Sequence, residues 1–176
     1  MSKPSEPKPA KLIASLFTAD LSIVNETLKR LREHWGDTDY LSEIIPFNHT
    51  DYYAEEMGTP LMRMFVSFRK LIPPDTLPDI KLYTNSIEKH FCIDHKRRVN
   101  IDPGYITPER LVLATGKNYS HRIYLRDGIY ADLTLIFKKG SFRPLEWTYP
   151  DYATSQVIEL MNAIRKRYIS QLREGA

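Results

Sequence analysis

The sequence predicts a single α+β domain built on a ferredoxin-like core, in the order strand, helix, strand, strand, helix, strand. Three observations support this. Short apolar runs alternate with helix-length segments in that order over residues 11–102. Residues 121–137 have the alternation of a β-hairpin, which extends the antiparallel sheet. Residues 157–172 repeat apolar side chains at helical spacing and predict a final helix. Helices are expected on one face of the sheet.

The first half of the core is punctuated by clear signals. Residues 11–18 form a short apolar run that predicts a buried strand. Asp20 is a candidate N-cap for the helix that follows, and Gly36 ends that helix. Residues 40–47 and 61–71 are the next two strands, and residues 48–60 between them form a loop or short helix.

The second half begins with a proline-rich approach to a helix over residues 80–91. Residues 97–101 predict the fourth strand, which Asp102-Pro103-Gly104 is expected to end as a turn. Residues 111–115 fit either a strand or the start of a helix. Residues 140–152 predict a loop rich in aromatic residues and proline.

The hairpin can be aligned from its apolar residues. If Ile123 and Leu125 share a buried face with Ile129 and the odd positions after it, the loop has three residues, Arg126 to Gly128. The outer face then pairs Tyr124 with Tyr130 and Arg122 with Asp132.

Composition sets broad limits on function. The 176 residues suit one domain over residues 11–176, preceded by a polar, proline-rich tail over residues 1–10 that we expect to be disordered. Lys and Arg exceed Asp and Glu by only 25 to 22, too little to indicate nucleic acid alone. A single cysteine, no signal peptide and no membrane-length apolar run predict a cytoplasmic protein without a membrane partner.

Two loops carry candidate catalytic groups. In Thr50-x-Tyr52-Tyr53-x-x-Glu56, the carboxylate of Glu56 can act as a base while Thr50 and Tyr53 bind. A loop packed by its own tyrosines is the alternative. Asp102 can reach a ligand from a strand end, or it can be a structural turn residue that accepts backbone amides.

The hairpin and the loop before it carry candidate binding groups. Lys117 and Arg122 can hold an anion, because arginine donates two parallel hydrogen bonds to phosphate or carboxylate. Tyr124 is a candidate catalytic hydrogen-bond donor. Asp132 pairs with Arg122 either in the site or as a solvated ion pair. His121 has the parity of the apolar face and is either a binding residue or a histidine at the core's edge.

Several classes of site lack their patterns. There is no HExxH, CxxC or G-x-S-x-G motif, and Gly116-Lys117 lacks the remainder of a P-loop. No metal site is therefore predicted, although Glu56, Asp102 and Asp132 would suit Mg²⁺ if the fold gathered them. No cofactor and no oligomeric state are indicated.

Five blocks together resemble the DUF4416 family of uncharacterised bacterial and archaeal proteins. The blocks span residues 50–58, 81–88, 100–105, 121–130 and 147–152, and the resemblance covers most of residues 11–152. The resemblance implies no established activity, so it assigns no catalytic residue.

Two functions follow from the residues. The first is an enzyme or ligand-binding domain for an anionic, possibly phosphorylated, small molecule. The alternative is an RNA-binding or protein-interaction module, which would use aromatic and basic side chains on an open sheet face, as RRM sheets do. A helix or the 140–152 loop covering the row from Arg122 to Thr134 would favour the first.

Overall fold

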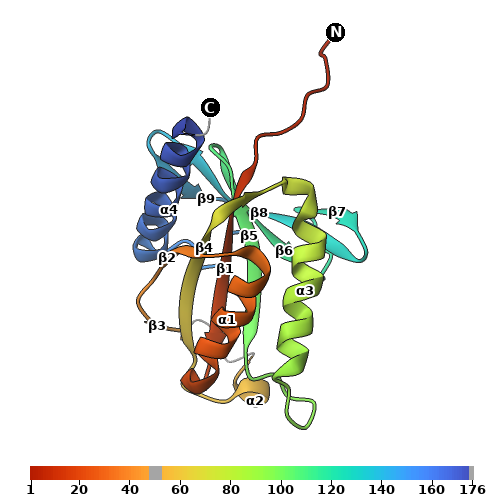
Figure 1. Cartoon of the computed structure of the whole chain (residues 1–176), viewed down its shortest axis with the longest axis vertical. Helices are drawn as coiled ribbons and strands as arrows, with labels where there is room; N and C mark the ends of the chain where they lie inside the picture. Colours follow the sequence, from red (N-terminus) through yellow and green to blue (C-terminus); the bar gives the residue numbers. More distant parts are fainter. Residues whose placement is uncertain (48–52, 175–176) are drawn as a thin grey trace.

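The computed structural model describes residues 1–47 and 53–174 and has a large mixed α/β fold (Figure 1). The strands of the described sheet pair in antiparallel fashion, in the order β2-β4-β1-β5-β6-β8-β7, with β3 on β4 and β9 on β8. The sheet has nine strands, so it is larger than the predicted core plus one hairpin.

The N-terminal elements follow the predicted signals closely. Strand β1 spans Ala10–Thr18 and is buried throughout, while residues 1–9 are exposed. The carboxylate of Asp20 accepts a hydrogen bond from the Ser22 amide and caps a 3-10 turn at Leu21–Ile23. Helix α1 then spans Val24–Trp35 and ends at Gly36, whose φ of 83° favours glycine.

The predicted strand over residues 40–47 is wrong in detail. It is two short strands, β2 at Thr38–Leu41 and β3 at Ile45–Pro46, and both pair with β4 at Met62–Ile72. Helix α2 at Ala54–Met57 lies between β3 and β4 in the chain.

Strand β5 corrects the predicted turn. After a 3-10 turn at Pro74–Thr76 and helix α3 at Leu77–His90, β5 spans Asn100–Ile106 and passes straight through Pro103 and Gly104. A Cβ at Gly104 would lie 2.4 Å from the Val112 carbonyl oxygen, so glycine is needed for close strand approach rather than for a turn. Strand β6 spans Arg110–Thr115, which settles the ambiguous segment as a strand.

The hairpin is confirmed in its cross-strand pairs and wrong in its loop. Strand β7 (Arg122–Arg126) and strand β8 (Ile129–Lys138) pair Arg122 with Asp132 and Tyr124 with Tyr130. The connection, however, has two residues with positive φ, Asp127 and Gly128, and the register shifts between Tyr124 and Arg126.

The shift in register accompanies exposed apolar side chains on β7. Ile123 is 69% exposed, and Leu125 is also exposed, so neither joins the core as predicted. Strand β9 (Ser141–Pro144) then pairs with β8, and helix α4 spans Ser155–Glu174.

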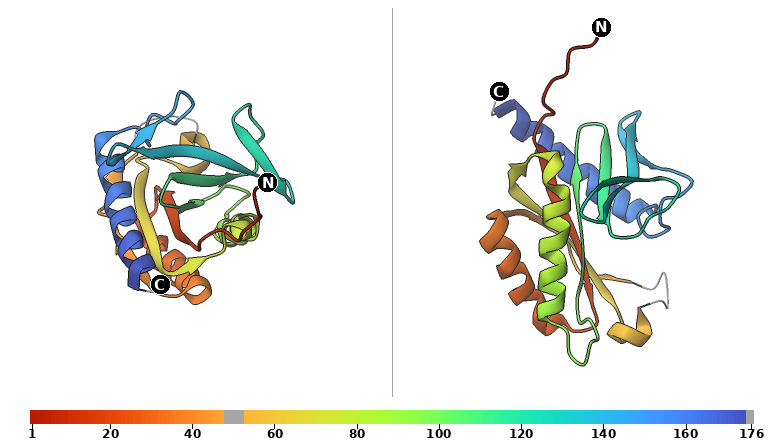
Figure 2. Two further views of the ribbon diagram at one scale, coloured as in Figure 1. Left: turned by 90° about the horizontal axis from the view of Figure 1, so that it is seen from above. Right: turned by 90° about the vertical axis from the view of Figure 1, so that its right-hand side faces the viewer.

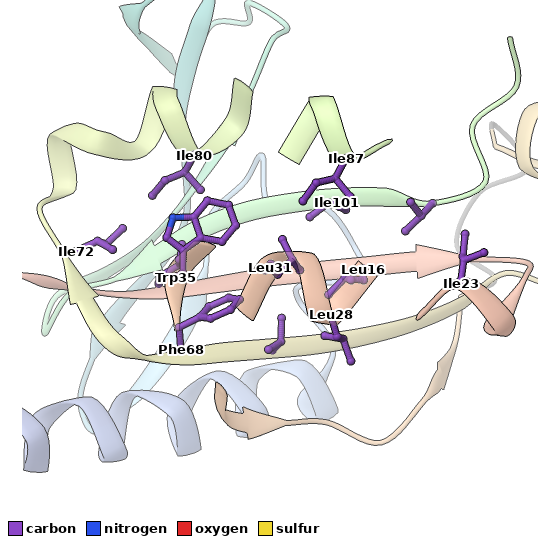
Figure 3. Packing of buried hydrophobic residues seen from close by; sticks show 14 of the residues in the cluster. Leu16, Ile23, Leu28, Leu31, Trp35, Phe68, Ile72, Ile80, Ile87 and Ile101 are labelled. Atoms are coloured by element: carbon purple, nitrogen blue, oxygen red, sulfur yellow. The ribbon is translucent and has the colours of Figure 1, made fainter. Parts of the chain in front are cut away.

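Helices cover both faces of the sheet, where the sequence predicted one (Figure 2). One core joins α1 and α3 to the even side chains of β1, as Leu28, Leu31 and Ile80 pack with Leu16 (Figure 3). The second core joins α4 to the odd side chains of β1 and β4. It includes Ile13, Phe65, Met161, Ile164 and Tyr168. The opposite parities of one strand therefore serve two different helix layers.

Candidate functional site

The first part of β5 has a free backbone edge, which helix α3 closes with two side chains. Strand β6 pairs only with residues 104–106 of β5. At Ile101, the amide donates to the Glu88 carboxylate at 2.6 Å, and the carbonyl accepts from Lys81 Nζ at 2.9 Å. Lys81 and Glu88 lie two helical turns apart, so they reach one residue of the strand. They replace the missing strand partner.

Glu88 is nearly buried, and this burial raises the pKa of its carboxyl group. The nearby positive charge of Lys81 and the Ile101 amide oppose that rise, while the charge of Asp102 adds to it. Glu88 Oε2 also lies 3.6 Å from Arg97 Nη1. Glu88 thus joins the strand edge to a larger polar network.

Arg97 is the centre of that network. Its Nε and Nη2 each donate to one Glu56 oxygen at 2.7 Å, a bidentate pair, and this hydrogen bonding lowers the pKa of Glu56. Arg97 Nη1 donates to Asn100 Oδ1 at 2.8 Å, and Asn100 Nδ2 donates to Asp102 Oδ2 at 2.8 Å. A chain of hydrogen bonds therefore links the two predicted catalytic carboxylates.

Asp102 has one firmly hydrogen-bonded oxygen and one that is held more loosely. Its other oxygen, Oδ1, lies 3.5 Å from Lys81 Nζ, and about a third of the side chain is exposed. A carboxylate with one hydrogen-bonded oxygen and one more loosely held oxygen can accept a hydrogen bond or a proton from a ligand.

Three buried polar groups lie on the sheet face next to Asp102. Ser15 on β1 pairs directly with Asp102 on β5. The Tyr152 hydroxyl lies near both of them, and the Arg63 guanidinium lies over the Tyr152 ring. Ser15 Oγ, Arg63 Nε and the Tyr152 hydroxyl are each buried and make no well-formed hydrogen bond with the described residues. The Ser15 and Tyr152 hydroxyls do lie close enough together for Ser15 to lower the pKa of Tyr152 slightly against the effect of burial. Unpartnered buried polar groups are few in proteins, and each calls for a water molecule or a ligand.

The surroundings of Arg63 keep this group in place. Arg63 is ion-paired with Asp151, and its guanidinium lies over the rings of Phe17, Phe47, Phe65 and Tyr152. Burial raises the pKa of the Tyr152 hydroxyl, so it stays protonated and able to donate; the charge of Arg63 opposes the rise.

The hairpin carries a second polar network, centred on Asp132. Its carboxylate Oδ2 accepts from Arg122 Nε at 2.8 Å and lies 3.3 Å from His121 Nε2. Arg122 and Asp132 side chains are each 8% exposed, so the solvated ion pair considered above does not apply. Arg122 also donates to the Tyr149 hydroxyl and to the Lys117 carbonyl, both at 3.1 Å.

The segment from Trp147 to Tyr152 covers the Asp132 end of the hairpin row and continues to the first group, while Tyr124 at the other end of the row stays exposed. Trp147 stacks on His121 with ring centroids 5.1 Å apart and donates to the Leu133 carbonyl, and Thr148 donates to the Thr134 carbonyl. Asp151 and Tyr152 then reach Arg63. This covering is the one that favours a ligand site over an open sheet face.

The strand registers place Asp102 and Asp132 on the same face of the sheet. Gly104 shares the sheet face of Asp102, because the two are two residues apart on β5. Across the sheet, Gly104 pairs with Leu113, Leu113 with Asp132, and Asp132 with Arg122, and directly paired residues share one face. Glu56, Asp102 and Asn100 are joined by hydrogen bonds, whereas the Arg122 network stands apart from them across β6. The predicted residues therefore form two groups on one face, not one cluster.

The remaining predicted residues have varied positions. Tyr53 packs edge-on against Phe17 with its ring beneath Arg97, and Lys117 offers its carbonyl oxygen to Arg122. Tyr124 is 58% exposed and touches Tyr130 edge to face. Thr50 lies outside the described residues.

Sequence reasoning did not select several residues of the site. Ser15 interrupts an otherwise apolar strand, which is a usable signal, and Lys81 and Glu88 stand at the two ends of the sequence block over residues 81–88. Arg63, Arg97 and Tyr152 carry no such signal, because only the fold brings them beside Asp102.

The described part of the chain contains no group of three or more His, Cys, Asp or Glu side chains arranged to hold a metal ion. Glu56, Asp102 and Asp132 are thus not gathered as Mg²⁺ ligands. None of its helices is long and apolar enough to cross a membrane.

Comparison with known proteins gives a family without an assigned activity. No curated protein and no solved structure matches the chain. The family model described as "Domain of unknown function (DUF4416)" matches residues 8–168, and this confirms the resemblance seen in the five sequence blocks. The chain belongs to the DUF4416 family.

Proposed function

We propose that this protein is an enzyme or ligand-binding domain for an anionic, oxygen-rich small molecule, which binds beside Asp102 on the sheet face that carries α4. The observation that carries the proposal is the group of three buried, unpartnered polar side chains, Ser15, Arg63 and Tyr152.

Each member of this group can donate a hydrogen bond. Arg63 Nε is a donor only, and the hydroxyls of Ser15 and Tyr152 can both donate. Three donors without protein acceptors suit phosphate or carboxylate oxygens, which accept several hydrogen bonds at once. Buried donors also hold an anion more strongly than exposed ones, because water does not compete with them.

Asp102 is the hydrogen-bond acceptor in a site whose other groups donate. It stands opposite the donors as the acceptor, with Asn100 and Lys81 fixing its carboxylate. In a bound complex it would accept a hydrogen bond from a ligand hydroxyl or remove its proton as a general base. Glu56 would act through Arg97, since both of its oxygens are engaged there.

The anion-binding roles expected for Arg122 and Lys117 change in this proposal. Arg122 uses its guanidinium on Asp132, Tyr149 and the Lys117 carbonyl. Its role is to fix the hairpin against the Trp147–Tyr152 segment, which supports the inner side of the site.

The proposal is tested by a thermal-shift screen of the intact protein with inorganic phosphate, sugar phosphates and dicarboxylates. Hits are then measured by calorimetry with Asp102→Asn and Ser15→Ala. Ser15→Ala removes a donor to the anion, and Asp102→Asn removes the charged acceptor for a ligand hydroxyl. We therefore expect hits that carry a hydroxyl, such as sugar phosphates, to bind both variants about tenfold or more weakly. Unchanged binding of every hit by both variants would exclude this site.

Glu56→Ala and Arg122→Ala complete the test, because both residues act here by positioning. They should weaken binding less than Asp102→Asn does. Stronger losses for Arg122→Ala than for Asp102→Asn would move the ligand to the hairpin.

RNA or protein binding through the sheet remains the alternative proposal. Helices cover both faces of the central strands, so an exposed platform is limited to the hairpin, where Tyr124 and Ile123 lie open. A shift assay with mixed RNA at rising salt tests it, because phosphate-driven binding weakens steeply with salt. Tyr124→Ala should then reduce binding by removing a stacking surface.

We also infer a ferredoxin-like core and a cytoplasmic location. The strand order β2-β4-β1-β5, with α1 and α3 packed on one face, supports the first inference. The single cysteine supports the second.

A further inference from the structure

A groove lies on a different part of the molecule, between the C-terminal half of α4 and strands β2 and β4. It encloses about 650 Å³. Its lining is polar and charged apart from one alanine, and comprises Asp39, Arg69, Ala163, Lys166, Arg167, Ser170, Gln171 and Glu174. None of these residues belongs to the site beside Asp102.

The floor of the groove is built around Lys11, which is fully buried. Lys11 Nζ is ion-paired with Asp39 and donates to Gln171 Oε1 at 2.7 Å and to the Phe68 carbonyl at 2.9 Å. Burial lowers the pKa of Lys11, the hydrogen bond and charge of Asp39 oppose this, and the charges of Arg167 and Arg69 lower it further. Three cationic side chains therefore converge on this spot.

The groove has more positive charge than its carboxylates neutralise. Three cations line it, Arg69, Lys166 and Arg167, and none of them has an ion-pair partner among the described residues. Of the two lining carboxylates, Asp39 is taken up by Lys11 and by the Ser67 hydroxyl. Glu174 is therefore the one lining carboxylate left to offset the positive charges of Arg69, Lys166 and Arg167.

We propose that this groove is a second anion site, which binds a multiply charged phosphate group such as a di- or triphosphate. Two arginine forks and a lysine on opposite walls match several phosphate oxygens at once. Arg167 lies over the Tyr40 ring, 5.7 Å from its centroid, which holds the guanidinium at the groove wall. Lys11 behind the floor neutralises Asp39, so that carboxylate does not offset the positive charge of the groove walls.

The two sites are physically separate and can be tested independently. Tyr152 precedes the first turn of α4, whereas Lys166 to Gln171 lie in its last three turns. At 1.5 Å per residue this separates them by roughly 20 Å along the helix. Ligand binding in the groove therefore does not depend on ligand binding beside Asp102, and failure at one site leaves the other untouched.

The experiment is calorimetric titration of the intact protein with inorganic triphosphate, and in parallel arms with pyrophosphate and ATP. The main variant is Lys166→Glu, and the matched control is Lys89→Glu, an exposed helical lysine on α3 with the same change of charge. Arg69→Gln is the second variant, and circular dichroism verifies that each variant is folded.

We expect Lys166→Glu to weaken triphosphate binding about tenfold or more, and Lys89→Glu to change it less than about twofold. Tighter binding of ATP than of triphosphate would identify a nucleotide as the source of the phosphates, and equal binding would identify the free oligophosphate. The proposal is overturned if the wild-type protein binds none of the three probes. It is equally overturned if both charge reversals weaken binding alike, because the effect is then one of net charge.

Discussion

The polar networks beside β5 and the hairpin differ from the α4 groove in how their cations are neutralised. Arg63, Arg97 and Arg122 each contact a carboxylate on a neighbouring element. Arg69 and Lys166 in the groove contact none among the described residues. Paired cations join elements of the fold and reach a ligand only through a donor that the pair leaves over, as Arg63 does with Nε, whereas unpaired cations remain able to bind ligand oxygens with the whole charged group. An arginine within a dense motif is thus weak evidence for an anion site until its partner is known.

The largest expected effect comes from the Arg63–Asp151 pair. Arg63→Met leaves Asp151 buried without its cation, and should lower the free energy of unfolding by about 3–5 kcal/mol. Urea denaturation measures this. The double variant Arg63→Met, Asp151→Leu should recover much of the loss, because no unpaired charge remains. If the single variant is as stable as the wild type, the pair does not hold the Trp147–Tyr152 segment.

A smaller loss is expected at the hairpin. Arg122→Ala should lower the free energy of unfolding by about 2–3 kcal/mol, less than Arg63→Met because His121 still contacts Asp132. Arg126→Ala is the matched control. Arg126 lies on the same strand as Arg122, but its ion pair with Asp79 of α3 is exposed to solvent. Its thermal midpoint should not change measurably. Equal losses in the two variants would contradict a buried network.

Glu56 and Glu88 should give pH dependences of opposite sign. Glu88 has a raised pKa, so the folded state holds more protons than the unfolded state above pH 4.5, and stability falls as pH rises through that window. Glu56 has a lowered pKa, so its contribution is present above pH 4.5 and is lost as pH falls.

Denaturant unfolding from pH 3 to pH 8 tests this sign. Relative to the wild type, Glu88→Gln should gain stability as pH rises above about 4.5. Glu56→Gln should lose relative stability as pH rises from 3 and then stay level. The same slope in both variants would mean that burial does not distinguish the two carboxyls.

Local patterns predicted the elements, and their failures have identifiable physical causes. Asp20 caps the 3-10 turn that leads into α1, and Gly36 ends the helix; both signals were found because they act within a few residues. Pro103 was taken for a strand end, yet its missing amide is harmless there. The backbone N–H and C=O of Ile101 point away from β1 and toward α3. The backbone of Pro103, two residues later, points the same way, and β6 pairs with β5 only from residue 104 onward, so no strand partner needs an amide at Pro103.

The hairpin loop failed for a different reason. The three-residue loop assumed that Ile123 and Leu125 were buried, whereas β7 is the edge of the sheet and leaves them exposed. Burial that depends on distant packing cannot be taken from alternation alone.

The candidate site was predicted only in part. Glu56 and Asp102 were predicted as candidates in two separate loops, and the structure joins them in one network. The link between them, Arg97 with Asn100, depends on how α2 meets β5. The unpartnered group of Ser15, Arg63 and Tyr152 comes from three segments far apart in the sequence. No spacing rule connects such residues.

The most direct test of the account compares two buried tyrosines. The Tyr168 hydroxyl donates to the Pro9 carbonyl at 2.7 Å, whereas the Tyr152 hydroxyl makes no well-formed hydrogen bond with the described residues and has only the Ser15 hydroxyl near it. Tyr168→Phe should therefore lower the free energy of unfolding by about 1 kcal/mol, while Tyr152→Phe should leave it within about 0.5 kcal/mol of the wild type or raise it. An equal loss in both variants would contradict the proposed ligand site beside Asp102, because the Tyr152 hydroxyl would then make a structural hydrogen bond and would not be available to a ligand.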